Sequence, residues 1–244
     1  MDTDRGNMPI AIMIAAMVVS LAIVMLFVPV IPQSQSYHAF ADQRTLLGIP
    51  NFWNVISNVP FVVIGAIGWL RYRNDPATFV LFIGICLTGF GSAYYHWNPT
   101  DDTLFWDRLP MTLGFMAILA GIVAERIDAR AGALLLWPLL GFGLFSLLWW
   151  RWHDDLRLYA WAQFFPILAL PVLFWLFPAK YTNAIYWLIA AACYTVAKVF
   201  EFSDAAIYSV GEMLSGHTLK HLAAAVACWA ILRYFQTRKA IEGA

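Results

Sequence analysis

The sequence predicts an all-α, polytopic integral membrane helix bundle, with a seven-helix core and one additional N-terminal transmembrane helix. Of its 244 residues, 61% are hydrophobic and 12% are charged, whereas soluble domains average about 45–50% apolar and about 25% charged residues. The apolar residues form eight runs, each close to the roughly 20 residues that a helix needs to cross a bilayer. The weak alternation that marks transmembrane β-strands is absent from these runs.

Short polar or proline-containing breaks separate the eight predicted spans. The first, residues 8–30, contains no charged residue. We interpret it as a retained helix, because the apolar region of a signal peptide is usually about 7–15 residues long. The other seven spans are predicted at residues 52–70, 77–97, 104–124, 131–150, 158–177, 183–202 and 214–235. Backbone polar groups in lipid must be satisfied within their own segment, so each span should be helical.

The charged residues exclude one class of partner and orient the spans. Fifteen basic residues are balanced by fifteen acidic ones, so the chain lacks a basic field for nucleic acid. An even number of spans places both termini on one side, and the segments on that side carry nine Lys and Arg against four on the other. The positive-inside rule therefore predicts that both termini are cytoplasmic.

Polar residues inside spanning helices are costly and are candidates for function. Ser92 and His96 lie four residues apart at the end of the third span, and so do His217 and His221 at the start of the eighth. Residues with this spacing share a helix face. Asp107 lies at the start of the fourth span, so the predicted topology brings all five residues to the extracytoplasmic side. A lone His pair also arises by chance, but three histidines at one depth predict a metal site, and such a set with an open position is typical of catalytic zinc.

These residues resemble those of the alkaline ceramidases, part of a superfamily of seven-helix membrane hydrolases that includes the adiponectin-receptor-like proteins. The matching features are Asn51-Phe52-Trp53-Asn54-Val55-Ile56-Ser57-Asn58, Gly91-Ser92 followed by His96, Asp107 in an Asp-x-Leu-Pro-Met context, and His217-x-x-x-His221. The resemblance covers roughly residues 42–238 and indicates a bacterial-type member with an extra N-terminal helix. We therefore divide the chain into residues 1–40 (cytoplasmic tail and extra helix), 41–238 (hydrolase domain) and 239–244 (cytoplasmic tail).

The resemblance implies a Zn²⁺ ion held by His96, His217 and His221. It implies that Asp107 holds and deprotonates the attacking water, and that Ser92 steadies the metal site or the oxyanion. Zinc can polarise a carbonyl and acidify a water molecule, and a nearby carboxylate can take the proton. The implied reaction is hydrolysis of the amide bond of a ceramide, a membrane lipid, to a fatty acid and a sphingoid base. The protein would be a multi-pass protein of the cell membrane if bacterial, with the zinc site toward the extracytoplasmic side.

Other polar residues have open roles. Lys198, Glu201 and Asp204 recur at i, i+3 and i+6 near the end of the seventh span. They are consistent either with a Lys–Glu pair that neutralises itself in the membrane or with residues that support the metal ligands or touch the substrate. Asn54 and Asn58 of the matching segment are candidates for this second role.

The chain departs from the pattern of the animal enzymes in one region, and two other functions are consistent with the same residues. The animal enzymes have an acidic N-terminal calcium site with a Glu where this chain has Asn51, and Asp42 is the evident carboxylate nearby. Asp42 and Asn51 would therefore give only a weak calcium site. The same zinc site could instead hydrolyse phospholipid or other acyl esters. A heptahelical receptor or transporter with a structural zinc is the non-enzymatic alternative.

Overall fold

The computed structural model describes the backbone of residues 3–242, with side chains described from Met8 onward. The ends of the two predicted tails, and the Arg5 side chain that entered the charge comparison, lie outside the described residues. Within residues 3–242 the chain is helical and forms no β-strand. The predicted all-α membrane bundle is therefore confirmed.

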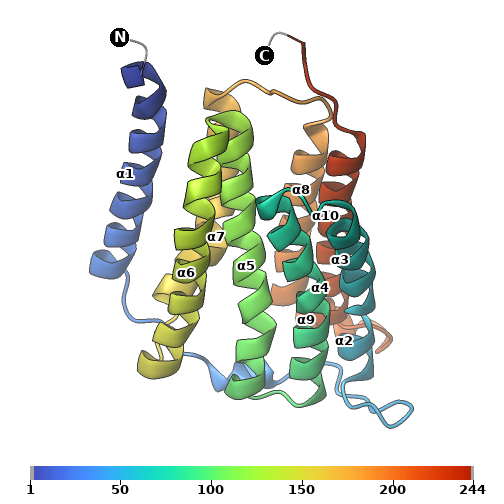
Figure 1. Ribbon diagram of the computed structural model, residues 1–244. Helices are drawn as coiled ribbons and strands as arrows, with labels where there is room; N and C mark the ends of the chain where they lie inside the picture. Colours follow the sequence, from blue (N-terminus) through green and yellow to red (C-terminus); the bar gives the residue numbers. More distant parts are fainter. Residues whose placement is uncertain (1–2, 243–244) are drawn as a thin grey trace.

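Eight long helices make up the bundle (Figure 1). They are α1 (Thr3–Phe27), α3 (Val59–Arg71), α4 (Pro76–Trp97), α5 (Asp101–Arg126), α6 (Ala129–His153), α7 (Arg157–Leu176), α8 (Ile185–Phe202) and α10 (Gly216–Thr237). Three short helices lie between them: η1 (Gln35–His38), α2 (Phe52–Ile56) and α9 (Asp204–Tyr208). Side chains that accept a backbone N–H fix several starts, among them Asp75 before α4, Thr100 before α5 and Ser215 before α10. Such caps satisfy donors that the first turn leaves free.

Seven segments are long and apolar enough to cross a membrane, including α1 and the combined α2–α3 segment Phe52–Arg71. The eighth predicted span, α10, is outside this set although it has 22 residues. Its first turns carry His217, Lys220 and His221, which lower its mean hydropathy. Because α10 packs along α8 and α3, these polar side chains face protein rather than lipid.

The order of packing places α5 at the centre. α5 packs on α4, α6 and α7 and has the largest share of buried residues among the spans. α1 lies at one edge, where it packs on α7 and is otherwise almost fully exposed. The start of α1 and the end of α10 lie at the same end of the bundle (Figure 1), as an even number of crossings requires.

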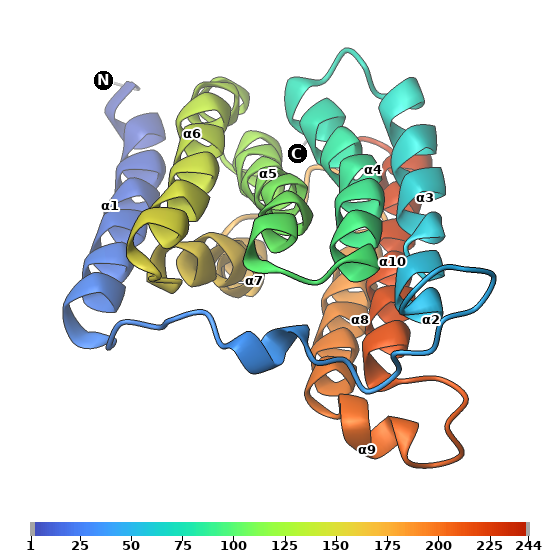
Figure 2. The same cartoon turned by 90° about the horizontal axis from the view of Figure 1, so that it is seen from below.

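Residues 28–51, which we call the strap, cross the opposite end of the bundle from α1 to α2 (Figure 2). The strap is held through both side chains, such as His38 against Tyr95 and Asp101, and its backbone. The carbonyl of Ile31 accepts from the N–H of Leu156, the N–H of Gln33 donates to Asp154, and the N–H of Ala41 donates to Asp204. Segments distant in sequence thus fix the strap over the ends of the helices.

Candidate metal centre

Three buried histidines meet where α4 ends and α10 begins. His96, His217 and His221 each offer a ring nitrogen within 4.8 Å of the others, and His96 Nε2 lies 3.2 Å from His221 Nε2. Zinc–nitrogen bonds of about 2.0–2.1 Å in a tetrahedron separate the ligand nitrogens by about 3.3–3.4 Å. His96 Nδ1 is buried and has no hydrogen-bond partner among the described residues. Imidazole nitrogens that face one another and find few hydrogen-bond donors are available to bind a cation. These residues therefore fit the predicted zinc.

The start of α10 is pressed against α8 and α9. A Cβ at Gly216 would lie 2.2 Å from the Phe200 carbonyl oxygen, so no larger residue fits without a shift. The Asp204 carboxylate accepts a hydrogen bond from the backbone N–H of His217 at 2.7 Å. The i, i+3, i+6 pattern therefore does not hold on one helix, because α8 ends at Phe202 and Asp204 begins α9. Asp204 positions His217 instead of facing Lys198.

The segment around α2 supports the histidines from the side. The Ser57 hydroxyl lies 2.8 Å from His221 Nδ1, and Asn51 Nδ2 donates to the His96 carbonyl at 2.8 Å. Asn54 accepts from the Thr218 hydroxyl at 2.8 Å. Partners on the second ring nitrogen orient a metal-ligating histidine. The sequence pattern alone does not predict this role for Ser57, because the contact depends on how α2 packs against α10.

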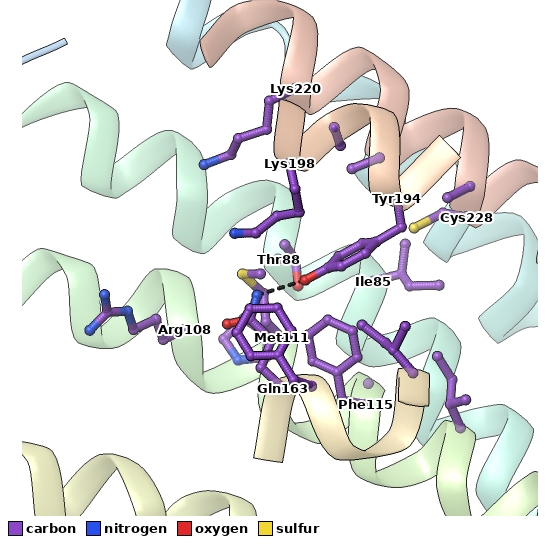
Figure 3. Close-up of a pocket in the computed structure, with 18 of the residues that line it drawn as sticks. Ile85, Thr88, Arg108, Met111, Phe115, Gln163, Tyr194, Lys198, Lys220 and Cys228 are labelled. Carbon is purple, nitrogen blue, oxygen red and sulfur yellow. Dashed lines mark hydrogen bonds between the residues drawn. The ribbon is translucent and has the colours of Figure 1, made fainter. Parts of the chain in front are cut away.

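A cavity of about 470 Å³ opens beside the histidines. Ser92, Asp107 and His221 line one end, and apolar side chains such as Phe115 and Ile231 line most of the remainder. Along α10 the lining runs from His221 to Ile231, which is about 15 Å at 1.5 Å per residue. Figure 3 shows the cavity, with Gln163 of α7 donating to the Tyr194 hydroxyl of α8. A chamber of this length and polarity suits an acyl chain.

Asp107 and Ser92 are brought together by the close approach of α5 and α4. A Cβ at Gly91 would lie 2.1 Å from the Trp106 carbonyl oxygen, so the two backbones touch where these side chains begin. Both side chains are buried and line the same cavity. The structure thus gathers all five residues that the sequence analysis grouped.

The Ceramidase family model matches residues 46–243. The chain belongs to the ceramidase family. The matched region includes the three histidines, Ser92 and Asp107, and it begins after α1. Comparison with curated proteins gave no match.

A second polar cluster adjoins the site that this ceramidase-family chain forms. Glu201 is paired with both Lys198 and Lys220, and the Tyr37 hydroxyl of the strap also donates to it at 3.1 Å. Lys220 Nζ lies 3.2 Å from His217 Nε2. The Lys198–Glu201 ion pair is therefore present, but it is part of a larger group that lines the cavity. Sequence analysis missed the role of Lys220, since Lys220 and Glu201 are on different helices.

The residues considered for a calcium site are engaged elsewhere in this member of the family. Both oxygens of the Asp42 carboxylate accept from the Arg44 guanidinium, at 2.8 and 2.7 Å. Burial alone would raise the pKa of Asp42, but these hydrogen bonds outweigh it and lower the pKa. The Asn51 side chain donates to the His96 carbonyl. Both residues named for a weak calcium site thus have partners within the protein, Asp42 the Arg44 guanidinium and Asn51 the His96 carbonyl.

Proposed function

We propose that this member of the ceramidase family is a zinc-dependent intramembrane amidohydrolase. Its substrate would be a ceramide-like N-acyl lipid, and its products a free fatty acid and an amine, in the case of ceramide a sphingoid base. One observation carries the proposal: three buried histidines lie beside Asp107 and Ser92 at the polar end of an otherwise apolar cavity.

His96, His217 and His221 would hold the zinc. When bound, zinc polarises the amide carbonyl and makes a water molecule more acidic. The Asp107 carboxylate takes the proton of the attacking water as a general base. As the new C–O bond forms and the C–N bond breaks, Asp107 gives that proton to the leaving nitrogen. The Ser92 hydroxyl orients the Asp107 carboxyl or donates to the oxygen on which negative charge develops.

The cavity would position the lipid. The acyl chain occupies the apolar part, between residues such as Phe115 and Ile231, and so brings its carbonyl to the polar end. Asn58 also lines the cavity, and its Oδ1 is buried without a hydrogen-bond partner among the described residues. We assign it to the substrate, as an acceptor for the amide N–H. Burial of the whole site excludes bulk water and soluble peptides.

The membrane placement is part of the proposal. We place both termini in the cytoplasm and the metal centre toward the extracytoplasmic side. The division into residues 1–40, 41–238 and 239–244 follows, with α1 as an extra helix before the hydrolase domain. The start of the family match at residue 46 supports placing α1 before the hydrolase domain, whereas its end at residue 243 lies beyond the proposed domain end at residue 238.

The decisive experiment uses purified protein and a panel of lipid amides and esters, with and without a chelator. Released fatty acid is identified by mass spectrometry. We expect release from N-acyl sphingoid lipids, loss of activity with the chelator, and loss of both zinc and activity in His217→Ala. Release from acyl esters alone would replace the amidase by an ester hydrolase. Bound zinc without hydrolysis of either class would favour a receptor or transporter.

A further inference from the structure

Arg108 is a buried cation without an anionic partner. It follows Asp107 on α5, lines the cavity and is 6% exposed. None of the acidic side chains in the described part of the chain forms an ion pair with it. Its Nη1 is buried and has no hydrogen-bond partner there. An unpaired buried charge is strongly destabilising, so its presence beside the site points to an external partner.

Three aromatic rings hold the Arg108 guanidinium in place. Its Cζ lies 4.5 Å from the Trp150 ring centroid, 4.7 Å from that of Tyr159 and 5.6 Å from that of Tyr37. Cation–π contacts stabilise the charge through the ring faces. They do not satisfy the N–H donors at the edge of the guanidinium, of which arginine has five. The group is therefore fixed in position with donors left for a ligand.

The surroundings of Arg108 add positive charge. Lys198 and Lys220 share the single carboxylate of Glu201, and Tyr37 contacts both Arg108 and Glu201. Figure 3 shows Arg108, Lys198 and Lys220 toward the same side of the cavity, away from Ile85 and Cys228. Counting Asp107, the side chains give three cations and two carboxylates, and a bound Zn²⁺ would add further positive charge. An anionic ligand would therefore be favoured at the polar end.

We propose that Arg108 binds an anionic group, a carboxylate or a phosphate, on the amine part of the lipid, so that among N-acyl lipids the protein favours those with a negatively charged headgroup. This inference rests on the proposed function and specifies its substrate class. The apolar part of the cavity holds the acyl chain, which leaves the headgroup at the end where Arg108 lies. The planar guanidinium matches the two oxygens of such a group.

The test compares two substrates with one acyl chain, N-palmitoylglycine and N-palmitoylethanolamine, which differ in headgroup charge. The readout is the ratio of their kcat/KM values, with the full-length protein in detergent–lipid micelles. We expect the wild type to favour N-palmitoylglycine. Arg108→Gln should reduce this ratio at least about tenfold, mainly through the KM for N-palmitoylglycine, because a hydrogen bond to a charged group is lost. Arg108→Lys should retain part of the preference. Arg151→Gln removes an arginine paired with Asp102 outside the cavity and should leave the ratio unchanged.

Binding is measured separately, as the shift in unfolding temperature with N-palmitoylglycine, N-palmitoylethanolamine or palmitate. We expect N-palmitoylglycine to give the largest shift, and Arg108→Gln to remove most of it. If that shift appears without hydrolysis of either amide, the anion site stands and the proposed function fails. If both amides are hydrolysed and the ratio is the same in wild type and Arg108→Gln, the proposed function stands and the anion site is refuted. If palmitate depends on Arg108 as strongly as N-palmitoylglycine does, Arg108 holds the acyl carboxylate of the product, which overturns the headgroup assignment.

Discussion

The Ser57 hydroxyl orients the His221 ring, because it lies 2.8 Å from the Nδ1 atom. With that nitrogen engaged, the Nε2 atom is directed toward the other histidines. Loss of such a supporting contact typically weakens metal binding about 10–100-fold. We therefore expect Ser57→Ala to lower zinc affinity by this factor, as measured by competition with a chelator. Ser209→Ala, which alters an exposed hydroxyl bonded to the Ala206 carbonyl, should keep the wild-type affinity. An unchanged affinity in Ser57→Ala would show that Ser57 does not orient the ligand.

Asp107 should affect rate rather than metal content. It lies beside Ser92 at the polar end of the cavity, and in our proposal it carries the proton of the attacking water. Replacement by Asn removes the base and keeps the shape. We expect hydrolysis by Asp107→Asn to fall about 10²–10⁴-fold with zinc retained, as measured by fatty-acid release and metal analysis.

The control for Asp107 lies on the same helix. Asp102 is exposed and pairs with Arg151 at the surface, so Asp102→Asn should retain activity. If Asp107→Asn instead loses its zinc, Asp107 is a metal ligand and its assignment as the base is wrong.

Helix packing sets the distance between Ser92 and Asp107. At Gly91 an added Cβ would meet the Trp106 carbonyl oxygen of α5 at 2.1 Å, so Gly91→Ala must separate α4 from α5. We expect it to destabilise the protein by roughly 1–3 kcal/mol, as overpacking does, and to lower activity by moving Ser92 away from Asp107. The midpoint of thermal unfolding and the rate of hydrolysis are the two measurements.

Gly141 in α6 is a matched site for this comparison. A Cβ there would meet nothing within 4 Å in the described part of the chain. Alanine is favoured over glycine inside a helix by roughly 0.5–1 kcal/mol. Gly141→Ala should therefore be neutral or slightly stabilising and should keep full activity. Equal effects of the two substitutions would contradict the close approach of α4 and α5.

The end of α1 is bound by Arg157, which donates to the carbonyls of Met25 and Val28. Asp155 holds that guanidinium and also accepts from Trp149. Burial alone would raise the pKa of Asp155, but the hydrogen bonds from Arg157 and Trp149 outweigh it and lower the pKa to about 2. Since the unfolded-state pKa is about 3.9, the stabilisation by Asp155 is complete above about pH 4 and is lost as the pH falls through about 2.

Asp155→Asn tests this linkage. Its unfolding temperature should lie below that of the wild type at pH 7, and the difference should shrink between about pH 4 and pH 2, where the wild-type carboxylate becomes protonated. Thermal unfolding in detergent across this range measures the difference. A gap that stays constant down to pH 2 would mean that the ionised carboxylate does not hold Arg157.

The orientation of the whole molecule in the membrane can be predicted from where its two termini lie. The start of α1 and the end of α10 lie at one end of the bundle (Figure 1), and the metal centre lies at the other. The positive-inside rule predicts that the end with the termini is cytoplasmic. A reporter active only in the cytoplasm should therefore be active when fused after Gly243. A reporter that works only outside the cytoplasm, when fused at the same position, would reverse this orientation.

The architecture could be predicted because apolar runs of about 20 residues leave few alternatives to helices in a bilayer. Breaks in the helices within those runs are harder to predict from the sequence. The second span is split into α2 and α3 near Asn58, where Pro60 follows in the first turn of α3. The five grouped site residues could be placed at one depth from helix direction and spacing. Ser57, Lys220 and Arg108 could not, because their roles depend on contacts between helices and on the absence of a partner.

The strap and the arrangement of α7 and α8 have a consequence for how a lipid arrives. Ile31 and Tyr37 of the strap line the cavity, and the strap crosses the end of the bundle opposite the two termini (Figure 2). In the described part of the chain α7 and α8 both line the cavity, and their backbones approach each other at few points. Side chains join them through the Gln163–Tyr194 hydrogen bond, the Phe174–Trp187 ring contact and Lys198 over the Phe164 ring. On the proposed function, a lipid would enter sideways between α7 and α8, by diffusion in the plane of the bilayer. The concentration that sets the rate would then be two-dimensional: turnover would follow the mole fraction of substrate among the membrane lipids and would be insensitive to the volume of buffer around them.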